Sequence, residues 1–227
     1  MFRTLLPFVP ALPLLLLASS AHAVVLSAGA GQILPGTSLA QRPELAGTII
    51  ADQTFAFSQL SNDPTPDLTL RNYVVRETAT GTLDFYYQFN NVGTTVEGPQ
   101  GSLVLNGFTT TTIDADYRTD IGQSPGETGI TYLPTSPNSQ VFFFGNTRSS
   151  DGMQWHIQPG ASLAPFFIRT NATDFIAAGE ADIPNVNLFH TAFIPVSGSQ
   201  PGVPEPATLA LLPLALAALV TRHRRHA

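Results

Sequence analysis

The sequence predicts an all-β protein: an antiparallel β-sandwich or jelly-roll-like body, flanked by an N-terminal signal helix and a C-terminal hydrophobic helix. Three observations carry this prediction. Apolar and polar residues alternate with a period of two through the middle of the chain. Gly, Pro and Asn fall between the alternating runs, where turns are expected. The most apolar stretches lie at the two ends of the 227 residues.

The N-terminal stretch has the three parts of a secretory signal peptide. Arg3 is the only charged residue before an apolar run over residues 5–18, and Ala21-His22-Ala23 follows. A positive start, a short apolar run and a small-x-small site are the features that signal peptidase recognises. We therefore predict a signal peptide over residues 1–23, cleaved after Ala23. An uncleaved anchor helix is the alternative, which three prolines in the run disfavour.

The body, residues 24–195, is predicted to form one β-sandwich domain. Strict alternation predicts half-buried strands at 83–90, 113–118 and 155–157, and the continuous apolar run 141–144 predicts a strand covered on both faces. Further strands are expected at residues 49–59, 68–76, 102–108, 162–170 and 187–194. Residues 26–41 are interpreted as a loose entry segment, and residues 196–202 as a flexible linker.

The composition of the chain excludes several functional classes. The ten basic residues are all Arg, and sixteen acidic residues give a formal net charge of −6. This acidic balance argues against a nucleic-acid partner, which needs a basic face. The absence of Cys excludes disulfides, thiolate metal sites and Cys nucleophiles.

One acidic motif is a candidate calcium site. Asp114, Asp116 and Asp120 form D-x-D-x-x-x-D, and two carboxylates at i and i+2 on a strand point to the same face. Calcium takes six to eight such oxygen ligands. The EF-hand spacing is absent, so a solvated strand face is the alternative. No other cofactor is expected.

Two aromatic residues are candidates for stacking on sugars. Tyr86 lies opposite in parity to its apolar neighbours on the predicted strand, and Trp155 is the single Trp. Aromatic faces pack against the C–H groups of sugar rings, although large aromatics more often fill a core. A carbohydrate- or calcium-binding module is therefore kept as the alternative function.

Two weaker alternatives remain. Gly122-Gln123-Ser124-Pro125-Gly126 fits the G-x-S-x-G pattern of hydrolases, with His156 and His190 as possible bases, but no helix is expected after it. An ordinary loop is the simpler interpretation. The run Thr109–Thr112 could order water as ice-binding surfaces do, but one rank of Thr indicates only β-propensity.

The C-terminal stretch also has three parts. Val203, Pro204, Glu205 and Pro206 precede an apolar run over residues 207–220, and Arg222, Arg224 and Arg225 follow. Fourteen helical residues span about 21 Å, short of a ~30 Å hydrocarbon core. The arginines would stop transfer and stay on the cytoplasmic side of the inner membrane. The run is thus expected to be a short transmembrane helix.

These residues resemble a PEP-CTERM sorting signal over 203–227, the mark of an exosortase substrate. The resemblance implies a Gram-negative, exopolysaccharide-producing source and cleavage near Glu205 by exosortase, a membrane cysteine protease-transpeptidase. It implies a membrane-anchored precursor that becomes a cell-surface or extracellular protein. It says nothing about the chemistry of the body, because the family places this tail on unrelated proteins.

Together these observations predict a non-enzymatic surface or extracellular-matrix protein associated with exopolysaccharide. Its expected partners are signal peptidase, exosortase and exopolysaccharide, and the inner membrane for the precursor. No nucleic-acid partner is expected. The prediction of no enzyme follows from the lack of an assembled catalytic motif.

Overall fold

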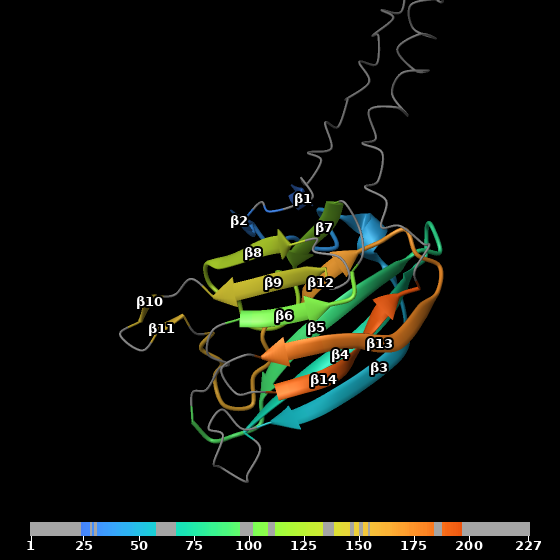
Figure 1. Cartoon of the computed structure of the whole chain (residues 1–227). Helices are drawn as coiled ribbons and strands as arrows, with labels where there is room; N and C mark the ends of the chain where they lie inside the picture. The colour runs from blue at the N-terminus through green and yellow to red at the C-terminus, as the bar shows by residue number, and fades with distance from the viewer. Residues whose placement is uncertain are drawn as a thin grey trace, which may run out of the picture.

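A computed structural model shows two antiparallel sheets packed face to face (Figure 1). The structure describes the following residues: 24–27, 29, 31–57, 67–95, 102–108, 112–133, 139–145, 148–149, 152–153, 155–183 and 188–196. The predicted all-β sandwich body is confirmed. The two predicted flanking helices lie outside the described residues, and the described part of the chain contains no helical segment with the length and hydropathy of a membrane span.

Each large sheet has six strands, and every neighbouring pair is antiparallel. The first sheet, in spatial order, contains β1 (Val24–Ser27), β7 (Thr112–Tyr117), β12 (Phe166–Arg169), β5 (Leu83–Asn91), β4 (Leu68–Glu77) and β3 (Gly47–Phe57). The second contains β14 (Leu188–Pro195), β13 (Phe175–Ile183), β6 (Ser102–Asn106), β9 (Gln140–Gly145), β8 (Thr128–Leu133) and β2 (Gly31–Ile33). A small hairpin joins β10 (Arg148–Ser149) to β11 (Gly152–Met153).

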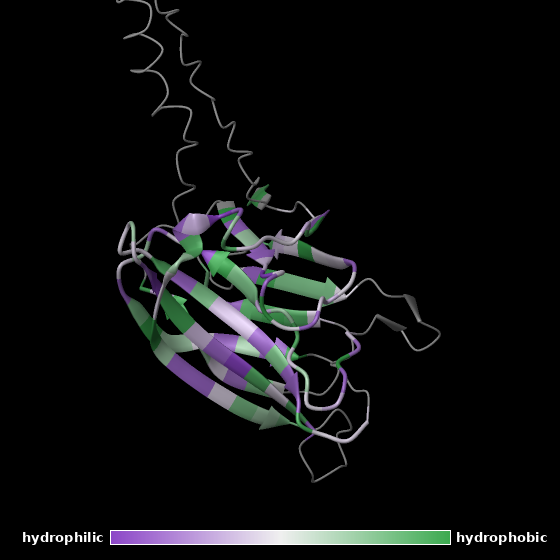
Figure 2. Ribbon diagram, turned by 180° about the vertical axis from the view of Figure 1, so that it is seen from behind, coloured by the Kyte–Doolittle hydropathy of each residue, from purple (hydrophilic) through white to green (hydrophobic). Residues whose placement is uncertain are grey.

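The main core lies between the two sheets and is rich in aromatic rings. Trp155 packs against Phe89 and Phe166, with ring centroids 5.4 and 5.2 Å apart, and Phe143 of the second sheet packs on Phe166 at 5.0 Å. Hydrophobic and hydrophilic residues alternate along the long strands (Figure 2), because successive side chains point to opposite faces. The period-two pattern therefore identifies the buried face correctly.

Most predicted strands are present, with three differences. The stretch 155–157 is not a strand, although Trp155 and Ile157 are buried, because a loop carries both side chains into the core. Strand β9 is not covered on both faces, since Phe142 and Phe144 are half-buried while Val141 and Phe143 are buried. Strands β8 and β13 were not predicted, and neither were the short strands β1, β2, β10 and β11.

The entry segment is integral to the fold, so its interpretation as loose is wrong. Strand β1 pairs with β7, and β2 pairs with β8. Residues 34–46, which include the 3₁₀ turn η1 (Pro43–Leu45), then cross the outer face of the first sheet. There Leu45 packs in a second apolar cluster with Tyr73, Val75, Tyr86 and Phe167. We call residues 34–46 the covering segment.

The free edge of β14 is closed by side chains of the first sheet. The amide of Phe193 donates to Oδ1 of Asn72 at 2.8 Å, and its carbonyl accepts from the hydroxyl of Tyr87 at 3.2 Å. The carbonyl of Thr191 accepts from Nε2 of Gln53 at 2.9 Å. These bonds satisfy edge groups that another chain could otherwise pair with.

Replacing Asn72 with Ala is expected to lower the free energy of unfolding by about 2 kcal/mol. Asn72 is buried, and its loss would leave the amide of Phe193 and the carbonyl of Tyr86 without their side-chain partner. Urea unfolding measures the change. Asn90→Ala, which removes a half-buried bond to Thr69, is the control and should cost less than about 1 kcal/mol. Equal losses would contradict this role for Asn72.

Candidate functional site

The three acidic residues predicted to bind calcium lie on or just after β7, but each has a protein partner. Asp114 is buried and receives two hydrogen bonds from the guanidinium of Arg42, at 3.1 and 2.7 Å. Asp120 is paired twice with Arg118, at 2.8 Å for both bonds. In Asp116, Oδ1 accepts from the amides of Gly36 and Tyr117, at 2.9 and 2.8 Å.

The three carboxylates therefore do not converge on a shared cation. Asp114 and Asp116 do share one face of β7, as the strand geometry predicts, but the covering segment lies over that face. Across the described ranges, no group of three His, Asp or Glu side chains is placed to hold a metal ion. The alternative, a solvated strand face, does not hold for Asp114 and Asp116, because both residues are buried.

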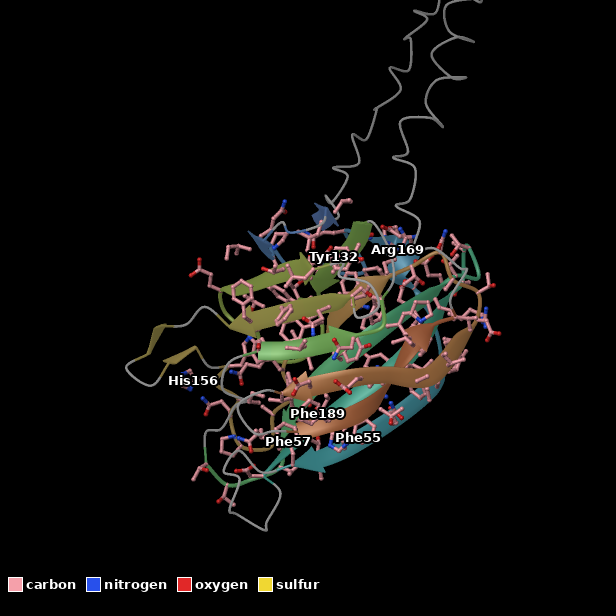
Figure 3. The ribbon with its side chains drawn as sticks, in the orientation of Figure 1. Phe55, Phe57, Tyr132, His156, Arg169 and Phe189 are labelled. Atoms are coloured by element: carbon pink, nitrogen blue, oxygen red, sulfur yellow. The ribbon has the colours of Figure 1, made fainter. Side chains whose placement is uncertain are left out.

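The face under the covering segment instead carries a buried network of ions. In strand register, Asp84 of β5 lies opposite Arg169 of β12, and Arg169 lies opposite Asp114. Arg169 also makes two hydrogen bonds to the carboxylate of Glu77 on β4. Arg42 lies over this row, with its guanidinium 5.6 Å from the ring of Phe167. We call Arg42, Glu77, Asp84, Asp114 and Arg169 the buried charge cluster; Figure 3 labels Arg169 near the covering segment.

Asp84 is the unusual member of the cluster. It is fully buried, and neither carboxylate oxygen has a hydrogen-bond partner. Burial, followed by the nearby charge of Glu77, raises the pKa of Asp84 well above its ordinary value, although Arg169 opposes this. A buried carboxyl group with no donor is stable only when it is neutral. The fold therefore favours the neutral, protonated form of Asp84 over the carboxylate more than water does.

The other acidic groups on this face titrate differently. Burial raises the pKa of Asp116 to about 6, although the amides of Tyr117 and Gly36 partly offset this. Burial alone would raise the pKa of Glu77, but hydrogen bonds from Arg169 and Thr80 hold it below its usual range. The hydrogen bonds from Arg118 lower the pKa of Asp120. The arrangement suits the attachment of the covering segment better than proton transfer to a substrate.

The two residues predicted to stack on sugars are both in the interior. Tyr86 is 1% exposed and stacks on Tyr73 at 4.9 Å beneath the covering segment. Trp155 is 1% exposed and lies in the main core. Neither ring presents a face to solvent, because in each case a second layer covers it. The parity that places Tyr86 on the outer face of the sheet is correct, but this outer face is not exposed.

The residues of the two weaker alternatives are not assembled into a site. The Oγ of Ser124 accepts from the amide of Gly126 at 3.3 Å, as in a loop. The ring of His190 stacks on Phe55, while His156 is exposed in another loop. No hydrogen bond of the described residues joins Ser124 to either histidine. Of the Thr run, only Thr112 falls in the described part, at the start of β7.

The remaining predicted residues lie outside the described residues. They are the signal cleavage site at Ala21 and Ala23, the motif Val203, Pro204, Glu205 and Pro206, and the arginines Arg222, Arg224 and Arg225. Comparisons of the chain with protein-family models, with curated proteins and with solved structures found no match.

Proposed function

We propose that this chain is an exported, non-enzymatic surface or extracellular-matrix protein. In this proposal exosortase processes the precursor at its C-terminal tail, and the β-sandwich body serves in a matrix that contains exopolysaccharide. The single observation that carries the proposal is the order of features over residues 203–227: Pro-Glu-Pro, an apolar run and three arginines. The apolar run with its arginines is suited to holding the precursor in the inner membrane.

All the strands of the described residues lie between the two proposed processing sites. Strand β1 begins at Val24, directly after the expected signal peptidase cut, and β14 ends at Pro195, before the sorting motif. Both cuts would therefore leave every strand of the described residues intact. The body between residues 24 and 203 has six Arg against fifteen acidic residues, a charge that favours solubility outside the cell.

Mass spectrometry of the exported protein tests this proposal. We expect an N-terminus at Val24 and a C-terminus near residue 204 or 205. The substitution Glu205→Ala in the full chain should leave the uncut precursor in the membrane fraction. Glu127→Ala, which removes an exposed loop carboxylate in the body, is the matched control and should be processed normally. Recovery of an exported chain that still ends at Ala227 would contradict the proposal.

A further inference from the structure

Strand β3 is the one long open edge among the described strands. The sheets end at β1, β3, β14 and β2. Strands β1 and β2 have four and three residues, and side chains close the edge of β14. Strand β3 has eleven residues and pairs only with β4, and it forms the outer margin of the molecule (Figure 1). An edge of this kind presents a row of amides and carbonyls that another strand can pair with.

The usual devices that protect an edge strand are weak in β3. The strand contains no Pro and no Lys, and Asp52 is its only ionisable residue. Arg71 of β4 neutralises Asp52 through three hydrogen bonds, at 2.9, 3.1 and 2.6 Å. The ladder with β4 has one bulge, between Ile49 and Ala51, which leaves Ala51–Phe57 as a regular stretch. Charge therefore does not prevent a second strand from approaching.

The sequence of β3 is complementary to itself when it is reversed. From residue 49 to residue 57 it reads Ile-Ile-Ala-Asp-Gln-Thr-Phe-Ala-Phe: three apolar residues, three polar residues and three apolar residues. If two copies ran antiparallel about Gln53, the regular stretch beyond the bulge would place Ala51 opposite Phe55, with both side chains on the same face of the sheet. Directly opposed residues point to the same face of a sheet, so apolar residues would meet apolar ones.

Two apolar residues before the regular stretch are exposed. Ile49 and Ile50 are 46% and 39% exposed, which is costly for two consecutive apolar residues. They lie at the bulge, so a second copy paired over Ala51–Phe55 would shield them only at the end of the paired stretch. Asp52 would face Thr54, so no like charges would be directly opposed. Figure 3 shows Phe55 and Phe57 on this marginal strand.

We propose that β3 is a self-association edge, through which two copies of this chain join their first sheets into one continuous sheet. The two copies are related by a two-fold axis at Gln53, as a pairing between identical surfaces requires. This interface uses neither the buried charge cluster nor the processed tail, so it is independent of the proposed function.

Two opposite substitutions at one position test this register. The full chain is studied by sedimentation equilibrium in one mild detergent, so that the termini contribute equally to every variant. Thr54→Asp places a second carboxylate opposite Asp52 twice in each dimer and should raise the dimer dissociation constant about tenfold or more. Thr54→Arg places a cation there and should leave the dissociation constant unchanged or lower it.

The matched control is Thr119→Asp, which adds the same charge to an exposed position just after β7, at the side of the first sheet away from β3. It should leave association unchanged, and thermal melts should show that all three variants are folded. The chain has no Cys, so a mixture of Asp52→Cys and Thr54→Cys copies should form a disulfide-linked heterodimer more readily than either copy alone. A monomeric wild-type chain at 100 µM would overturn the proposal. Equal effects of Thr54→Asp and Thr119→Asp on the dissociation constant would overturn it too.

Discussion

The substitution Arg42→Met is expected to lower the free energy of unfolding by about 3–5 kcal/mol. Arg42 and Asp114 are 2% and 1% exposed in their side chains, and two hydrogen bonds join them. Removing the guanidinium would leave the carboxylate of Asp114 buried, with Arg169 as its nearest remaining cation at 4.0 Å. Unfolding in urea, followed by circular dichroism, measures the loss.

Two further variants distinguish this effect from the loss of any arginine. Arg71→Met removes an ion pair whose side chains are 33% and 40% exposed, so it should cost only about 0–1 kcal/mol. The double variant Arg42→Met with Asp114→Asn removes both charges and should recover part of the lost stability. If Arg42→Met and Arg71→Met cost the same, the covering segment is not held by the buried pair.

The substitution Asp84→Asn should flatten the decline in stability with rising pH. The pKa of Asp84 is higher in the folded chain than the unfolded value near 3.8. Its contribution to the free energy of unfolding is therefore complete below pH 3.8 and is lost as the pH rises through the folded pKa. Between the unfolded and the folded pKa, each pH unit lowers the free energy of unfolding of the native chain by about 1.4 kcal/mol. Asn has almost the same volume and cannot ionise, so the variant should not show this loss.

The comparison is most informative above about pH 7, where the contribution of Asp116, whose pKa is about 6, has already been lost. Glu77 has a lowered pKa, so its contribution is lost only as pH falls below about 4.5. Urea unfolding at a series of pH values from 6 to 9 gives the slopes. Parallel curves for the native chain and Asp84→Asn would show that Asp84 is already ionised in the folded state.

The sheets could be predicted from sequence where one face of a strand is buried and the other is polar. Strand β5 is the clearest case, because Leu83, Phe85 and Phe89 all point into the core. Strand β13 could not be predicted this way. Its first half, Phe175–Gly179, is largely exposed and contains a bulge, so it has no steady alternation. At Trp155 the error is the reverse, because a strand was predicted where there is none. A loop that buries every second side chain has the same sequence pattern as a short strand.

The buried charge cluster could be predicted only in part. The spacing of Asp114 and Asp116 correctly placed both on one face of a strand. Their partners could not be inferred, because Arg42 is 72 residues away from Asp114 in the chain and Arg169 joins it only through strand pairing. In a single sequence, alternate polar residues on a strand suggest a face exposed to water. In this protein the covering segment packs on that face of β7 instead.

The route of the covering segment has a consequence for the order of folding. Arg42 precedes its partner Asp114 by 72 residues, and Leu45 packs against Phe167, which lies still later in the chain. Until both of these residues have been synthesised, the covering segment lacks part of the surface that holds it. Contacts between residues so distant in sequence form slowly, so we expect this segment to stay accessible to proteases until a late stage of folding.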